Sequence, residues 1–155
     1  MGIDAERQIT GRVFCGIDPG REKFGFALAS PGRLLFAAII PFGKFGEALR
    51  YMSSGDAAPL ALWRMEGEAA RGKASCVFLG DGTSHAEYEK LMRGAGVEYQ
   101  LMDERMTTLE ARGLYWNLHP PRGLSRLLPL AMRVPPRPID DLAAWAIVRR
   151  ALADV

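Results

Sequence analysis

Cysteine and histidine are scarce in this chain, with two of each among 155 residues. Cys15 and Cys76 both lie in apolar runs, and two cysteines are too few for a disulfide framework or a metal knuckle. We therefore interpret them as small buried hydrophobic residues of a protein in a reducing compartment. His85 and His119 have no partner at metal-ligand spacing and are expected at the surface. Long hydrophobic runs are also lacking, because uncharged stretches such as 34–43 are far shorter than the roughly 20 residues that span a bilayer.

The amino terminus lacks the pattern of an export signal, since no basic start is followed by an apolar run. We therefore expect a cytoplasmic protein with no membrane partner. A composition of 48% hydrophobic and 25% charged residues excludes disorder and collagen-like repeats. A length of 155 residues fits one domain, and no Gly/Ser-rich linker divides the chain. A single domain over residues 1–155 is the expectation.

Acidic residues are missing from one long segment. Between Ala111 and Ile139 the chain has five arginines and neither Asp nor Glu. Arginine stays charged and binds phosphate through paired hydrogen bonds, so the segment suits a polyanionic partner. The net charge is only +2, and solvated surface arginines are the alternative interpretation. The five residues are Arg112, Arg122, Arg126, Arg133 and Arg137.

Apolar runs bounded by turn residues predict five strands. These are expected at 13–17, 24–30, 33–42, 74–79 and 97–102. Helical composition predicts broken helix over 44–71 and helices over 84–93, 107–116 and 139–153, with a Thr107–Glu110 capping box at the start of 107–116. Residues 117–138 hold more than half of the prolines and are predicted to be irregular. Three strands followed by alternating helices and strands indicate an α/β fold, a mixed sheet with helices on both faces.

Carboxylates directly follow the three predicted strands that have the composition of buried, central parallel strands. Ligands of open α/β sheets collect at the carboxyl ends of the strands. Crowded carboxylates raise each other's pKa, and hard divalent cations with oxygen ligands relieve this. A fourth source of acid opens the last helix. The acids are Asp18, Asp81, Asp103 with Glu104, and Asp140 or Asp141.

Each acid taken singly also has an ordinary structural use. Asp18 and Asp81 could merely form turns, Asp103 with Glu104 could be a solvated strand end, and the last pair could cap a helix. Their coincidence at matching strand ends, beside a basic segment, favours a metal site. Two ions roughly 3.5–4 Å apart can activate water and stabilise the leaving oxygen of a phosphodiester.

Three segments, in order along the chain, are similar to motifs of a known family. Gly16–Gly25 resembles the first-strand motif of RuvC-type Holliday-junction resolvases and their YqgF (RuvX) relatives. Asp103–Ala111 is close to the D-E-R-L-T-T-x-E-A signature of the YqgF family, and Asp140–Ala144 resembles its closing D-x-x-A-A helix. The resemblance spans residues 13–148, nearly the whole chain.

The resemblance implies an RNase H-like fold with a five-stranded mixed sheet, and a hydrolase that cuts phosphodiester bonds with Mg²⁺ or Mn²⁺. In that family's pattern Asp18 bridges two ions while Glu104 and Asp140 complete their shells, and the spacing to Ala143-Ala144 favours Asp140 over Asp141. Family members are linked to maturation of 16S ribosomal RNA precursors and, by analogy with RuvC, to Holliday-junction resolution. RuvC-type enzymes act as dimers, so a homodimer is a further expectation.

One loop departs from the family pattern. YqgF proteins usually carry G-L-P-x-x-x-x-G-[ST] after the fourth strand, whereas this chain has the shorter Gly80–Ser84. That loop is more similar to the YqgF-like domain of the transcription accessory protein Tex, which is thought to bind nucleic acid without cutting it. The departure makes Asp81 a candidate extra ligand and keeps a non-catalytic binding module as the alternative. In either case structured RNA or branched DNA is the expected partner, held by Arg21, Lys23, Arg105 and the five arginines of the acid-free segment.

Overall fold

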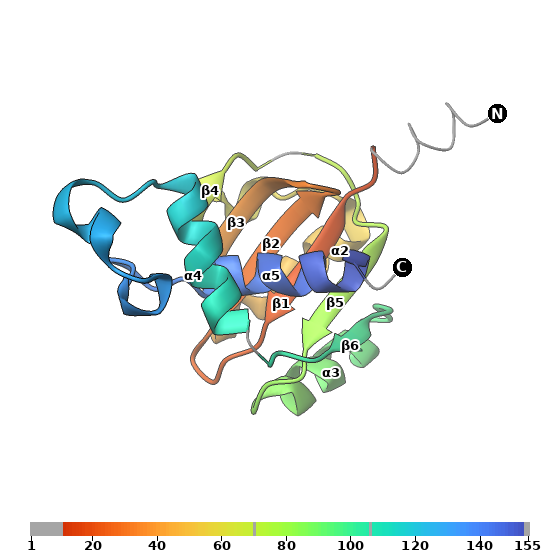
Figure 1. Ribbon diagram of the computed structural model, residues 1–155. Helices are drawn as coiled ribbons and strands as arrows, with labels where there is room; N and C mark the ends of the chain where they lie inside the picture. Colours follow the sequence, from red (N-terminus) through yellow and green to blue (C-terminus); the bar gives the residue numbers. More distant parts are fainter. Residues whose placement is uncertain (1–10, 70, 106, 154–155) are drawn as a thin grey trace.

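The computed structural model describes residues 11–69, 71–105 and 107–153, and these residues form an α/β fold around one mixed sheet (Figure 1). The amino-terminal residues on which the export-signal expectation depends lie outside this part. Six strands are described, in the order β4-β3-β2-β1-β5-β6. They are β1 (Phe14–Asp18), β2 (Lys23–Ser30), β3 (Arg33–Pro41), β4 (Arg64–Gly67), β5 (Cys76–Gly80) and β6 (Gln100–Met102). The pairs from β1 to β4 are antiparallel, whereas β1, β5 and β6 run parallel.

Helices cover both faces of the sheet. The α-helices are α2 (Phe45–Ser54), α3 (His85–Gly94), α4 (Thr107–Leu118) and α5 (Asp140–Ala153). Short 3-10 helices are η1 (Phe42–Lys44), η2 (Ala58–Trp63), η3 (Gly123–Leu127) and η4 (Leu130–Met132). Because side chains alternate along a strand, Cys15 and Ile17 of β1 join a core with α2 and α3, while Phe14 joins a second core with α4 and α5. Of the helices described, none is both long and apolar enough to cross a membrane.

The edges of the sheet differ from the sequence expectation. A sixth strand, β4, forms within the stretch expected to be helical, because its backbone groups pair with the otherwise open edge of β3. The strand expected to be central and buried at 97–102 is instead the short edge strand β6, with Leu101 46% exposed. The capping box is also wrong, since the Thr107 hydroxyl donates to the Glu104 carbonyl and Glu110 pairs with Arg150.

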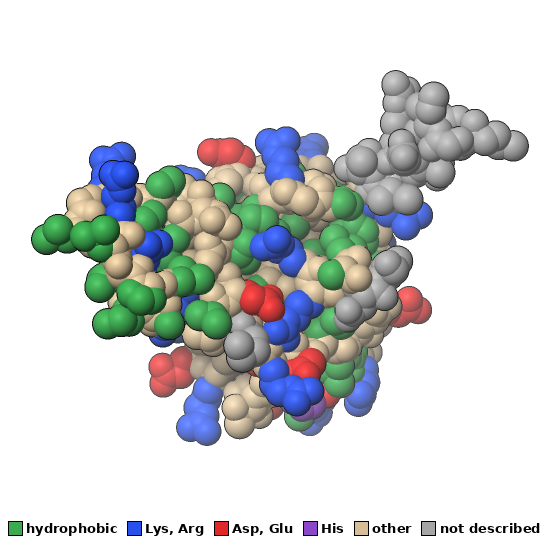
Figure 2. All heavy atoms as spheres, viewed as in Figure 1, with side chains coloured by type: hydrophobic (Ala, Val, Ile, Leu, Met, Phe, Trp, Pro, Cys, Tyr) green, Lys and Arg blue, Asp and Glu red, His purple; other side chains and the backbone are tan. Residues whose placement is uncertain are grey.

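The segment between α4 and α5 projects from the body of the protein (Figure 1). We call its residues 122–134, which include η3 and η4, the finger. Hydrophobic side chains gather on the finger in Figure 2, with basic side chains beside them. The predicted irregular connection is therefore a shaped protrusion, attached at one end to α4 and at the other to the start of α5.

Candidate active site

Asp18 and Glu104 meet at the carboxyl ends of the parallel strands. Asp18 is the last residue of β1, and Glu104 lies just beyond β6. Each of the two carboxyl groups affects the pKa of the other. Burial raises the pKa of Asp18 far above its usual range, and the adjacent Glu104 and Asp140 raise it further. Burial also raises the pKa of Glu104. Two such carboxylates cannot both stay charged unless a proton or a cation lies between them.

The loop after β5 forms a close-fitting cradle for Glu104. A Cβ on Gly80 or Gly82 would overlap the Glu104 carboxyl group, so a larger residue at either position would move that carboxyl group from its place. The backbone N–H of Glu104 donates to Asp81 Oδ1 at 3.0 Å, and its carbonyl accepts the Thr107 hydroxyl at 2.7 Å. Asp81, which is exposed, thus orients Glu104 through the backbone. Glu104 Oε1 is buried and has no hydrogen-bond partner among the described residues.

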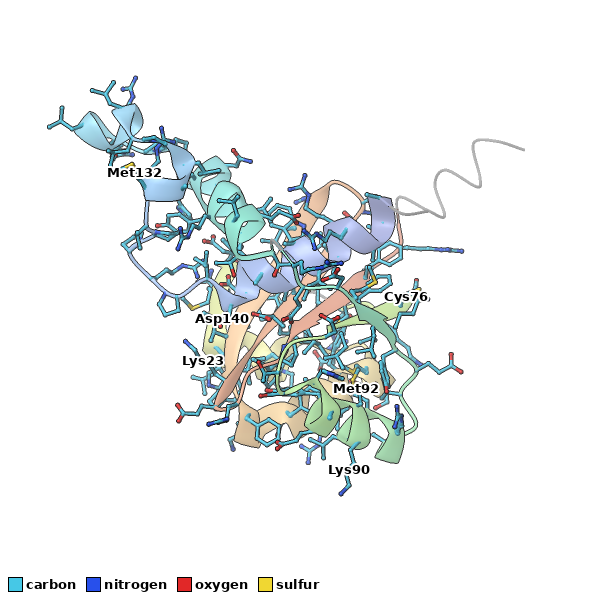
Figure 3. All side chains as sticks on the ribbon, turned by 60° about the horizontal axis from the view of Figure 1, so that its bottom comes forward. Lys23, Cys76, Lys90, Met92, Met132 and Asp140 are labelled. Atoms are coloured by element: carbon cyan, nitrogen blue, oxygen red, sulfur yellow. The ribbon has the colours of Figure 1, made fainter. Side chains whose placement is uncertain are left out.

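Helix α5 brings Asp140 to the same edge. Asp18 lies opposite Gly25 in the β1–β2 pair, and a Cβ on Gly25 would collide with the Asp140 backbone. Gly16 allows the same close approach one turn further along, against the Ala144 carbonyl. These glycines let the start of α5 lie directly on the sheet beside Asp18. The Asp140 carboxylate is 3.3 Å from the Lys23 ammonium, and Figure 3 shows the two residues together.

The structure separates Asp140 from Asp141. Asp141 is completely buried and accepts two hydrogen bonds from Arg137, at 2.8 and 3.2 Å. Arg137 also bonds Glu66 of β4 at 2.9 Å, and Glu66 in turn accepts from His119. Asp141 therefore ties α5 to the far edge of the sheet, while Asp140 remains at the candidate site.

The donor chemistry of the site fits a hard divalent cation. Its candidate oxygen ligands are Asp18, Glu104 and Asp140, one Glu104 oxygen is buried without a partner among the described residues, and Glu104 and Asp140 both raise the pKa of Asp18. Carboxylate oxygens are the ligands that Mg²⁺ and Mn²⁺ prefer. Within the part of the chain that is described, the side chains as they stand form no ready group of three metal ligands. The ion pair with Lys23 turns the Asp140 carboxylate toward an ammonium.

The basic residues expected to hold phosphate are in two different situations. Arg21, Arg122 and Arg126 are exposed. The others bond protein atoms: Lys23 pairs with Asp140, Arg105 with Asp103, Arg112 with the Ala131 carbonyl, Arg133 with the carbonyls of Ser125 and Arg126, and Arg137 with Asp141 and Glu66. Arg137, with a side chain only 20% exposed, is a structural residue in this arrangement.

The surroundings of His85 differ from the surface position that the sequence predicts. It is only partly exposed, and its Nδ1 lies 2.8 Å from the carboxylate of Glu89, a buried acid of α3 that also accepts from Tyr99. The His85 backbone donates to the carbonyl of Gly82, in the cradle of Glu104. The four-residue spacing between His85 and Glu89 was a visible signal, since such residues share a helix face.

No protein-family model matches this chain, and no curated protein matches it either. The chemistry of the site therefore has to be inferred from its own residues.

Proposed function

We propose that this protein is a metal-dependent nuclease of the RNase H-like, YqgF/RuvC type, hydrolysing phosphodiester bonds in structured nucleic acid. The observation that carries the proposal is the arrival of three carboxylates at one sheet edge, from β1, from the end of β6 and from the start of α5. Gly16 and Gly25 have no room for a Cβ beside the α5 backbone, and Gly80 and Gly82 lie against the Glu104 carboxyl group, so these close contacts bring the acids together. An arrangement that raises the pKa of its own central acid is typical of a functional site.

Asp18, Glu104 and Asp140 would hold the ions, with Asp18 central. Bound Mg²⁺ or Mn²⁺ supplies Lewis-acid stabilisation of the phosphate and a water activated for attack. The chain's own residues have defined tasks around them. Asp81 and Thr107 fix the backbone of Glu104. Lys23, with a side chain 47% exposed, can release Asp140 and donate to a phosphate oxygen of the substrate.

The direct test is a cleavage assay with Mn²⁺ that offers a four-way DNA junction and a precursor ribosomal RNA fragment side by side. The expected result is metal-dependent cutting of at least one of them, and the preferred one separates junction resolution from RNA processing. Tight binding without cutting under either metal would instead support the non-catalytic module. The ion pair between Lys23 and Asp140, which satisfies the third acid without a metal, is the observation that favours this second candidate.

Metal binding is expected to increase the free energy of unfolding. In EDTA, Asp18→Asn should be more stable than the wild-type protein by roughly 1–3 kcal/mol, because it removes a buried acid from beside two others. Mn²⁺ at a hundred times its Kd should stabilise the wild type by about 2.7 kcal/mol and leave the variant nearly unchanged. Thermal unfolding with and without Mn²⁺ measures both effects. An equal response of the two proteins would show that Asp18 is not a ligand.

Phosphate contacts are expected to come from the exposed arginines of the finger. Arg122→Ala combined with Arg126→Ala should lower the slope of log K against log salt by about 2, one unit for each lost contact. Binding titrations of a DNA junction at several salt concentrations give this slope. Arg50→Ala, an exposed arginine of α2 paired with Glu47, is the matched control. An unchanged slope in the double variant would place the nucleic acid on another surface.

A further inference from the structure

The finger displays aliphatic side chains that the rest of the protein leaves uncovered. Leu124 is 83% exposed, Leu127 81%, Val134 72% and Met132 63%. Single exposed hydrophobic residues are common on protein surfaces, but a group of large ones on one protrusion marks an interaction surface. Figure 2 shows this apolar group at the left of the molecule.

Hydrogen bonds hold the finger in one shape. The Arg133 guanidinium donates to the carbonyls of Ser125 and Arg126, at 3.0 and 2.8 Å. Trp116 of α4 donates to the Arg133 carbonyl at 3.1 Å, and Arg112 donates to the Ala131 carbonyl at 3.2 Å. Because these bonds order the backbone in advance, the apolar side chains can contact a partner at a reduced entropic cost.

The charge of the finger narrows the choice of partner. Arg122 and Arg126 are exposed beside the leucines, and no acid occurs between positions 111 and 139. A second copy of the chain packed symmetrically on this surface would set arginines against arginines. Anionic membranes are bound by clusters of about four to eight basic residues, more than the two exposed here. The pattern suits a partner that combines flat apolar groups with negative charge, as nucleic acid does.

We propose that the finger binds unpaired bases at the end or branch of a duplex, with Leu124 and Leu127 packed on the bases and Arg122 and Arg126 on the flanking phosphates. Leucine and methionine wedges of this kind enter between bases in known nucleic-acid complexes. This inference rests on the proposed function, because residues 135–139 connect the finger to Asp140 at the start of α5. Figure 3 shows Met132 on the finger and Asp140 where α5 starts.

The test compares a fully paired duplex with the same duplex ending in an unpaired fork, each made as DNA and as RNA. The fork carries 2-aminopurine, whose fluorescence reports base stacking, and EDTA prevents cleavage. The variant is Leu124→Ala with Leu127→Ala. Its matched control is Leu62→Ala, an 81% exposed leucine of η2 outside the finger. All these side chains are exposed, so the variants are expected to fold normally.

Wild type and Leu62→Ala should bind the fork about tenfold more tightly than the paired duplex and change the 2-aminopurine signal, in line with the burial of roughly 50–60 Å² of apolar surface against the bases. The double variant should lose this preference and keep its affinity for paired duplex. Equal binding of fork and duplex by the wild type would overturn the finger proposal, while the protein would still be shown to bind nucleic acid. Failure to bind any probe would count against the proposed function as well. Dissociation of a wild-type dimer by the double variant would instead make the finger an interface between copies.

Discussion

Asp18→Asn is expected to abolish cleavage, lowering the rate by about 10³-fold or more while the fold is retained. The substitution keeps the size of the side chain and removes the carboxyl group that would hold the ions, beside Glu104 and Asp140. A loss of 10³ corresponds to about 4 kcal/mol of transition-state stabilisation, within the range supplied by a bound metal. Single-turnover cleavage in Mn²⁺, with circular dichroism to verify folding, measures the effect.

Asp56→Asn is the matched control for this experiment. Asp56 is a partly buried acid in an isolated β-bridge with Arg71, where its side chain accepts the backbone N–H of Ala58, a bond that asparagine can also accept. The control should cleave at the wild-type rate. If a well-folded Asp18→Asn protein still cut nucleic acid, the assignment of the site to this sheet edge would be wrong.

Gly25→Ala is expected to destabilise the protein by about 3 kcal/mol and to reduce activity in the remaining folded fraction. The new methyl group would overlap the backbone of Asp140 and Asp141, which a packed helix cannot easily move away. Relief of the overlap requires the start of α5 to shift from the sheet, and Asp140 shifts with it. Urea unfolding measures the loss of stability. Cleavage measured without urea, at a temperature well below thermal unfolding, gives the loss of activity.

Gly46→Ala is the control, and it is expected to change the stability of the protein in the opposite direction. Gly46 lies in α2, has an ordinary helical conformation, and a Cβ there would meet nothing within 4 Å. The same chemical change should stabilise the protein by about 0.5–1 kcal/mol, because alanine is the better helix former. Similar losses in both variants would mean that contact with α5 is not what requires glycine at position 25.

Local sequence patterns were sufficient for most of the elements. Apolar runs closed by turn residues located β1, β2, β3 and β5, and helical composition located α3, α4 and α5, with ends displaced by a few residues. These patterns are informative because residues on one buried face of a strand or helix recur at a fixed spacing along the sequence. The placement of Asp18, Asp81 and Glu104 at one edge followed from the same patterns, since each lies at or just beyond the carboxyl end of a parallel strand.

The edge strands could not be located in this way. β4 and β6 are short, exposed strands whose identity depends on pairing with a neighbour distant in sequence. Arg64–Gly67 has no apolar run of its own, and Gln100–Met102 looks like the end of a buried strand although Gln100 and Leu101 are exposed. Pairing at an edge is decided by which backbone groups of the sheet remain open, a property of the assembled sheet.

The sequence by itself determined the class of fold, the strand ends and the chemical types of the acids gathered there. The resemblance favoured Asp140 over Asp141, whereas only the tertiary structure showed where each of these carboxylates lies and which arginines have protein partners. Successive residues of a helix point about 100° apart, so the rotation of α5 on the sheet, set by its contacts with Gly16 and Gly25, directs Asp140 to the site and Asp141 to Arg137. The sequence does not distinguish Arg133 and Arg137 from Arg122 and Arg126. In the folded protein Arg133 donates to backbone carbonyls and Arg137 pairs with a carboxylate, because these partners come from other parts of the folded chain.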